Sequence, residues 1–187
     1  MQEPNTGDGD LLRRFCAGDR DAFTTIYLAH QPSIFRFALH MSGDRGAAAE
    51  LTQDVFVWLI HHAEAFQPER GAFGAFLSGV ARKLYLRRQY EARRWAPIDD
   101  ATGAAGEDRL ESDTTELKNA IAALPVKYRE IVVLCDLEEK SYEEASVLAE
   151  CAVGTVRSRL HRARGLLAQK LLARRGNGRD EAVRCSV

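Results

Sequence analysis

Apolar positions recur at helical spacing on both sides of an acidic, glycine-containing stretch that runs from Trp95 to Ser112. Before this stretch, the spacing predicts helices over Asp10–Cys16, Asp21–Met41, Ala47–Phe66 and Phe73–Arg94. Pro32 lies inside the second helix and is expected to end or kink it near its middle. The first half of the chain is therefore predicted to be a set of packed helices.

After the stretch, helix-start signals accompany the apolar spacing. Asp113 is predicted to cap a helix through Leu124, with Glu116 three residues later as its capping-box partner. Pro125 is expected to be the first residue of a helix through Leu137, since a proline fits the first helical position. Both signals predict that the second half of the chain is helical too.

The last two predicted helices are joined by a tight turn. Ser141 and Glu144 have capping-box spacing before a short helix to Ala149, and a longer basic helix runs from about Gly154 to Leu172. A short helix, a turn and a longer basic helix are typical of a helix-turn-helix.

The stretch 95–112 has two interpretations, a linker between two domains or a surface loop within one. Its length favours the linker, because structureless loops beyond about 12–15 residues are uncommon in compact domains. The expected fold class is all-α: two small helical domains, 10–94 and 113–175, are joined by a flexible acidic linker. Residues 176–187 are expected to lack regular structure.

Charge is distributed unevenly along the chain of 187 residues, whose net charge is only -1. Lys and Arg outnumber Asp and Glu by 12 to 9 over residues 10–94 and by 11 to 7 over residues 117–175. Residues 95–116 contain 1 basic and 7 acidic residues. The overall charge therefore hides two mildly basic blocks, which are compatible with nucleic-acid binding.

Several functional classes are excluded by what the sequence lacks. No run of 18 apolar residues is present, the first ten residues do not resemble a secretory signal, and the cysteines show no CxxC spacing. No Gly-rich phosphate loop, HExxH or GxSxG occurs, and His61 and His62 would point about 100° apart on a helix. We expect a cytoplasmic protein that is not an enzyme and has no cofactor or metal.

The last helix combines one apolar stripe with a basic face. Val156, Leu160, Ala163, Leu167 and Leu171 share the stripe, and four arginines fall within the eight residues 157–164. The guanidinium group of arginine can donate two hydrogen bonds to the edge of a guanine in the major groove, or bind a backbone phosphate. A merely solvated basic face is the alternative, and the preceding capped helix and turn favour DNA contact.

A second basic cluster ends the predicted helix 73–94. Residues 82–94 hold six Lys and Arg and one Glu, interleaved with Tyr85 and Tyr90. Charge next to aromatic planes suits single-stranded DNA, whose unstacked bases need a π surface. The alternative is a basic helix end that only complements the helix dipole.

A third segment, Ala48–Leu59, places Glu50, Gln53 and Asp54 on one side of an otherwise apolar helix. Such a polar patch can dock a basic partner, or it can simply be solvated.

Together the three segments resemble the extracytoplasmic-function group of the sigma-70 family over residues 10–94 and 113–172. AELTQDVFVWL is similar to region 2.2, FGAFLSGVARKLYLRR to regions 2.3 and 2.4, and LPVKYREIVVLCDLEEKSYEEASVLAECAVGTVRSRLHRAR to region 4. The resemblance implies a sigma region 2 bundle and a sigma region 4 helix-turn-helix, and it assigns residues to three tasks. For core polymerase binding, the resemblance implies Glu50, Leu51, Gln53, Asp54 and Phe56. For −10 DNA binding it implies Arg82, Lys83, Tyr85, Arg87 and Arg88. For −35 DNA binding it implies Thr155, Arg157, Ser158, Arg159, His161 and Arg162. It also places segment 66–73 on the loop that captures a flipped base.

The implied partners are core RNA polymerase, through its β′ coiled coil and β flap, promoter DNA and an anti-sigma factor. The chain is expected to act as a monomer on polymerase and without membrane insertion. It departs from the usual family residues at Ala49, Phe76, Lys83 and Arg87, and Glu150 stands where the turn usually has Gly, which requires a left-handed backbone or a reshaped turn. Two rival functions are a conventional helix-turn-helix regulator and a decoy that titrates an anti-sigma factor.

Overall fold

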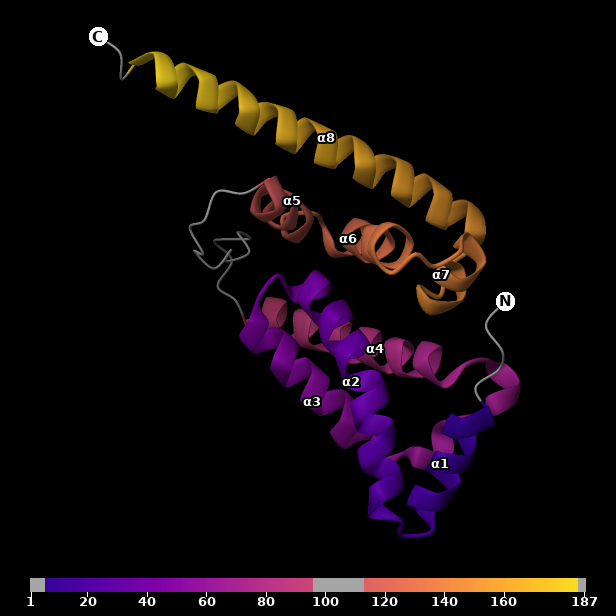
Figure 1. The fold of residues 1–187 in the computed structure, drawn as a ribbon. Coiled ribbons are helices and arrows are strands. Elements are labelled where there is room, and N and C mark those ends of the chain that lie inside the picture. The colour runs from indigo at the N-terminus through magenta and orange to yellow at the C-terminus, as the bar shows by residue number, and fades with distance from the viewer. Residues whose placement is uncertain (1–5, 96–112, 185–187) are drawn as a thin grey trace. The chain divides into compact units, whose positions relative to one another are not determined.

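A computed structural model of the protein describes residues 6–95 and 113–184, in which every regular element is helical (Figure 1). The chain divides into two compact units, with the division between Ala101 and Thr102. The predicted linker, except for Trp95, lies outside the described residues. The all-α fold class is thus confirmed for the described part of the chain.

The first unit is built from α1 (Thr6–Cys16), α2 (Arg20–Ser42), α3 (Arg45–His61) and α4 (Phe73–Trp95). Two 3-10 turns, η1 (Ala63–Ala65) and η2 (Pro68–Arg70), lie between α3 and α4, so the third helix ends before the predicted Phe66. Helix α2 packs against α1, α3 and α4. The core between these helices holds fully buried apolar side chains, the largest being Ile26, Ile34, Met41, Leu51, Val55, Leu59, Phe73 and Leu77.

Aspartates start the two helices at the centre of this unit. The carboxylate of Asp19 accepts a hydrogen bond from the backbone N–H of Ala22 at 3.2 Å, and that of Asp44 accepts one from Ala47 at 2.7 Å. Both bonds satisfy N–H groups that have no partner within their helix. Arg14 also donates to Asp19 at 2.7 Å, and this bond, followed by the Ala22 bond, lowers the pKa of the Asp19 carboxyl.

Pro32 is predicted from the sequence to end or kink α2 near its middle. It does not end the helix, which continues without interruption from Arg20 to Ser42. A proline inside a helix removes one N–H bond to the carbonyl four residues earlier. Here that carbonyl belongs to Leu28, and both Pro32 and Leu28 are exposed. Water can therefore solvate the carbonyl, and packing on both sides of Pro32 maintains the helix.

The second unit consists of α5 (Asp113–Ala122), α6 (Val126–Val132), the π-helical turn η3 (Val133–Leu137), α7 (Tyr142–Leu148) and α8 (Val153–Arg184). Helix α8 packs against α5, α6 and α7.

Two helix boundaries in this unit differ from the sequence prediction. Helix α5 ends at Ala122 rather than Leu124, and the Arg129 guanidinium donates to the carbonyl oxygens of both residues. Pro125 has an extended backbone with ψ 138°, so it precedes α6 as its cap instead of being the first helical residue. The arginine bonds satisfy carbonyls that the end of α5 leaves unpaired.

The predicted capping box at α7 is confirmed. The Glu144 N–H donates to Ser141 Oγ at 3.1 Å, and the Ser141 N–H donates to Glu144 Oε2 at 2.8 Å. Glu150, in the turn before α8, has φ 51°, so of the two expected outcomes the chain takes the left-handed backbone. A helix-turn-helix is thus formed with a glutamate where glycine is the low-strain residue.

Helix α8 is longer than the sequence pattern suggests. It continues from Val153 to Arg184, past the predicted end at Leu172. The expectation that residues from 176 onward lack regular structure is therefore wrong as far as Arg184, and 185–187 lie outside the described residues.

Candidate functional site

The N-terminal half of α8 presents a basic face because its opposite face is anchored in the core. Val156, Leu160 and Ala163 are buried, as the apolar stripe predicts. Their burial leaves side chains on the other faces of the helix exposed, namely Arg157, Ser158, His161, Arg162 and Arg164. The sequence-predicted −35 residues thus share the start of one helix, with Thr155 and Arg159 half-buried.

Contacts within the unit distinguish the arginines of this face. Arg164 donates to Asp136 Oδ1 at 2.6 Å and to Asp136 Oδ2 at 3.2 Å, and this hydrogen bonding raises the pKa of the Arg164 guanidinium. The Arg157 guanidinium lies 5.8 Å from the centroid of the Tyr142 ring. Arg164 is therefore held by a carboxylate, whereas the exposed Arg157 guanidinium lies over an aromatic face.

Two residues of α6 adjoin this surface and were missed by the sequence reasoning. Lys127 and Tyr128 line a hollow of about 190 Å³ together with the α8 residues Thr155, Ser158, Arg159 and Arg162. The Lys127 ammonium lies 5.0 Å from the Tyr128 ring centroid. A hydrogen bond from Arg162, and secondarily the charges of Lys127 and Arg162, lower the pKa of the Tyr128 hydroxyl. No pattern within α6 itself could have placed them beside α8.

The predicted polymerase-binding residues on α3 divide into buried and exposed groups. Leu51 is 1% exposed and Phe56 is 3% exposed, so both belong to the core of the first unit. Glu50 and Gln53 are exposed, and Asp54 is half-buried. Only the polar residues are accessible to a partner. Leu51 and Phe56 instead hold α3 in place by packing in the core of the first unit.

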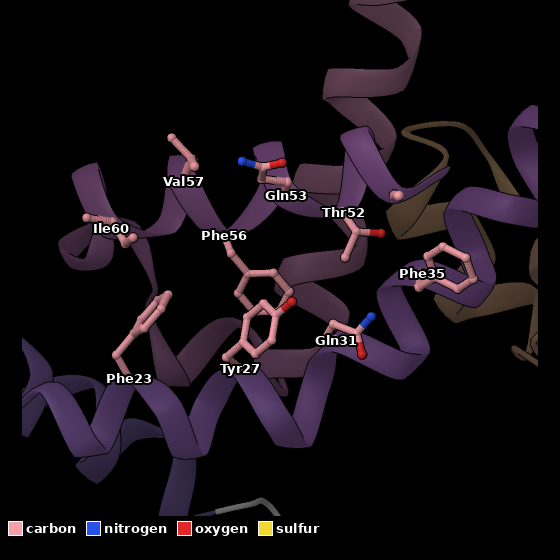
Figure 2. A pocket seen from close by; sticks show the side chains of 10 residues that line it. Phe23, Tyr27, Gln31, Phe35, Thr52, Gln53, Phe56, Val57 and Ile60 are labelled. Atoms are coloured by element: carbon pink, nitrogen blue, oxygen red, sulfur yellow. The ribbon is translucent and has the colours of Figure 1, made fainter. Parts of the chain in front are cut away.

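An apolar hollow of about 400 Å³ lies between α2 and α3, beside Gln53. Figure 2 shows Tyr27 of α2 and Phe56 of α3 meeting between the two helices, and their ring centroids are 4.7 Å apart. Val57 and Ile60 also line the hollow and are 45% and 46% exposed. Exposed apolar side chains beside polar ones are typical of surfaces that bind another protein.

The basic half of α4 holds the predicted −10 residues in three different environments. Lys83 and Arg87 are exposed, Arg82 and Arg88 are half-buried, and Tyr85 is only 4% exposed. The Tyr85 hydroxyl donates to the backbone carbonyl of Met41 at 2.8 Å, so this ring joins α4 to the end of α2. A base cannot stack on a ring that is buried in this way.

Exposed aromatic surface near this cluster comes from other residues. Tyr90, five residues after Tyr85 in α4, is 69% exposed. In the segment before α4, the ring of Phe66 lies 4.9 Å from that of Phe73 and 5.4 Å from that of Phe76, and Phe73 itself is buried. The segment predicted to capture a base is thus anchored by an aromatic cluster, with Phe66 half-buried at its start.

The histidines and cysteines form no site in the described residues. His61 and His62 are both exposed, and each ring bonds the carbonyl four residues earlier in α3. No group of three or more metal-ligating side chains occurs within 6–95 and 113–184. Cys135 is a free thiol whose pKa is raised chiefly by burial, and Cys185 lies outside the described residues. None of the described helices is long and apolar enough to cross a bilayer.

Comparison with known proteins agrees with this division into two functional regions. A profile of Sigma-70 region 2 matches residues 26–96, and a profile of Sigma-70, region 4 matches residues 114–167. The ECF RNA polymerase sigma factor EcfG of Rhodopseudomonas palustris is 30% identical over 176 residues, covering 89% of this chain and 96% of that protein. The ECF RNA polymerase sigma factor SigE of Mycolicibacterium smegmatis is 34% identical over 152 residues, covering 76% of this chain but only 58% of that protein.

Two solved structures are similar to this chain in fold. The sigma factor RpoE from Bartonella quintana, determined in complex with the anti-sigma factor NepR, superposes with a TM-score of 0.63 at 25% identity and covers 80% of this chain and 96% of that one. CnrH, in complex with the cytosolic domain of CnrY, matches the fold with a TM-score of 0.62 at 23% identity, covering 89% and 98% of the two chains. This chain belongs to the extracytoplasmic-function group of RNA polymerase sigma factors in the sigma-70 family.

Proposed function

We propose that this protein binds core RNA polymerase and directs initiation at specific promoters, with the first unit holding polymerase and the −10 strand and the second unit holding the −35 duplex. The observation that carries the proposal is the exposed basic face of α8, which a buried stripe of Val156, Leu160 and Ala163 fixes in a helix-turn-helix. It performs no covalent chemistry of its own, and its place of action is the cytoplasm, where polymerase works.

Core polymerase docks on the outward side of α3. Glu50 and Gln53 supply an exposed polar edge, and Val57 and Ile60 supply apolar surface beside the hollow between α2 and α3. Acidic and amide groups next to apolar surface suit a partner helix that carries basic residues, such as one arm of a coiled coil. Leu51 and Phe56 contribute by holding α3 in place from the core.

The unpaired −10 strand lies along the basic half of α4. Exposed Lys83 and Arg87, with half-buried Arg82, neutralise phosphates, and the ring of Tyr90 offers a stacking face. Tyr85 positions this helix through its bond to the Met41 carbonyl and does not contact DNA. Arg88 acts through its ion pair with Asp54 of α3.

The −35 duplex receives the N-terminal half of α8 in its major groove. Arg157, His161 and Arg162 are exposed there and reach base edges or phosphates, and Ser158 and Thr155 lie on the same turns. An anti-sigma factor restrains the protein until it is needed. The similarity to RpoE, which was solved with an anti-sigma factor, supports this part of the proposal.

Run-off transcription tests the proposal. Purified core polymerase is incubated with and without the protein on a pool of genomic promoter fragments, and start sites are mapped. Discrete new start sites that share a −35 and −10 pair are the expected result. Core binding without initiation would indicate the decoy, and duplex binding without core binding would indicate a conventional regulator; either result overturns the proposal.

A further inference from the structure

The hollow between α6 and α8 is surrounded by cations that come from two separate helices. Lys127 belongs to α6, and Arg159 and Arg162 belong to α8, with the hydroxyl groups of Tyr128, Thr155 and Ser158 between them. No Asp or Glu lines the hollow. A concave surface with this lining attracts a small oxyanion and provides donors for each of its oxygens.

Two other arginines of the described residues are paired with carboxylates, unlike the cations around the hollow. Arg164, two residues beyond Arg162, pairs with Asp136 at 2.6 Å, and Arg88 pairs with Asp54 at 2.6 Å. Among the described residues, no carboxylate lies within ion-pair distance of Lys127, Arg159 or Arg162. No carboxylate of the described residues therefore competes with a ligand for the cations around the hollow.

The hollow also has a suitable size and is partly preorganised. Its volume of about 190 Å³ is several times the ~30 Å³ that one water occupies in the liquid, which accommodates a tetrahedral phosphate and a few waters. Arg162 of α8 and Tyr128 of α6 line the hollow together, so a guanidinium and a phenol hydroxyl from two packed helices adjoin the same space. The hollow opens on the first turns of α8, where the helix dipole favours an anion.

We propose that this hollow binds one backbone phosphate of duplex DNA, with Lys127 of α6 and Arg162 of α8 donating to it directly. Helix α6 thereby becomes part of the DNA-binding surface, beyond the helix-turn-helix that the sequence pattern identifies. The inference rests on the proposed function, because it takes the DNA to be the −35 duplex on which α8 docks. A phosphate contact of this kind fixes the register of α8 on the duplex and carries no base preference.

The test uses holoenzyme assembled from core polymerase and the full chain, and a duplex that carries the −35 element identified by start-site mapping. Single phosphates on each strand are replaced one at a time by neutral methylphosphonates. Affinities are measured for the wild type, for Lys127→Gln and for Lys118→Gln, a control that removes an exposed lysine of the same unit outside the hollow. Salt dependence is measured for all three proteins.

We expect one methylphosphonate to weaken the wild type and the Lys118→Gln variant by roughly threefold to tenfold, the effect of losing one charge-assisted contact. The Lys127→Gln variant should lose little further affinity at that position, and its slope of log K against log salt should fall by about 0.9 relative to wild type. Tyr128→Phe keeps the ring but removes the hydroxyl, so it should give a smaller loss at the same phosphate.

Two results overturn the inference. In one, every methylphosphonate weakens Lys127→Gln and wild type equally, so that no phosphate is coupled to Lys127. In the other, the salt slope of Lys127→Gln equals that of the wild type. If wild-type holoenzyme binds no duplex selectively, the proposed function fails and this inference fails with it.

Discussion

Arg88 Nη2 lies 2.6 Å from Asp54 Oδ2, and Arg88 Nη1 lies 3.6 Å from Glu50 Oε2. An arginine from the basic half of α4 is thus neutralised by carboxylates from the polar edge of α3. The pair connects the surface proposed for the −10 strand with the surface proposed for polymerase. Because Arg88 and Asp54 are 35% and 43% exposed, solvent screens the pair substantially.

A double-mutant cycle of Arg88→Gln and Asp54→Asn should give a coupling of about 0.5–1 kcal/mol in the free energy of unfolding, the size expected of a half-exposed ion pair with a short hydrogen bond. Urea denaturation at low salt measures it, and the coupling should shrink in 1 M salt because ions screen the charges. Arg87→Gln with Glu91→Gln is the matched control, since this more exposed pair is 3.9 Å apart. Equal coupling in both cycles would contradict a specific role for Arg88.

Arg162→Ala and Arg164→Ala should separate DNA binding from stability. Arg162 borders the hollow and has no carboxylate partner among the described residues, whereas Arg164 is paired with Asp136. We expect Arg162→Ala to weaken −35 duplex binding by roughly tenfold or more, and Arg164→Ala to change it less than about twofold. Arg164→Ala should instead reduce stability, by under about 1 kcal/mol. Fluorescence anisotropy and thermal unfolding provide the two readouts, and a reversed ranking in the anisotropy would refute the assignment.

Glu150→Gly should stabilise the second unit. The backbone of Glu150 has φ 51°, which costs a residue with a Cβ roughly 1–2 kcal/mol and costs glycine little. Part of this gain is lost to the greater flexibility of glycine in the unfolded chain, so the net stabilisation should be about 0.5–1 kcal/mol. Glu143→Gly is the control, because Glu143 lies in α7, where glycine destabilises. Destabilisation by Glu150→Gly would show that the glutamate side chain outweighs the backbone strain.

Ser141→Ala should lower the free energy of unfolding by about 1 kcal/mol near neutral pH, because it removes the acceptor that caps α7.

The Ser141 N–H, and then the Ser141 side chain, lower the pKa of the Glu144 carboxyl. A pKa that is lower in the folded state stabilises the fold above the unfolded value, about 4.3, and this contribution disappears as pH falls through the folded pKa. Glu144→Gln should therefore flatten the fall in stability between about pH 5 and pH 3. An unchanged pH profile in urea titrations would exclude the ionised cap.

Tyr85→Phe should reduce stability by about 1–2 kcal/mol, because it leaves the Met41 carbonyl without its buried donor. Promoter melting by the folded variant should be unchanged, as the ring is 4% exposed and cannot stack a base. Tyr90→Ala gives the complementary result, with little effect on stability and reduced affinity for the single-stranded −10 DNA. Permanganate footprinting of the open complex measures melting, and a loss of melting in a fully folded Tyr85→Phe protein would restore Tyr85 as a DNA contact.

Local signals in the sequence determined much of this protein. The apolar stripe of α8 and the capping box at Ser141 depend on residues close together in the chain, so spacing and residue type suffice to predict them. At Glu150 the sequence left a left-handed backbone and a reshaped turn open, and the structure has the left-handed backbone. Spacing and charge also located three segments with binding character. The resemblance that these segments carry identified the family, and their assignment to polymerase, −10 and −35 binding remains a prediction.

Only the tertiary structure decided which members of these segments face outward. Leu51, Phe56 and Tyr85 carry residue types that suit a binding surface, yet packing against other helices buries them. Contacts between distant positions, such as Asp54 with Arg88 and Asp136 with Arg164, select the cations that are neutralised. Periodicity cannot reveal these choices, because it describes one helix at a time, while burial and charge pairing depend on which helix lies opposite.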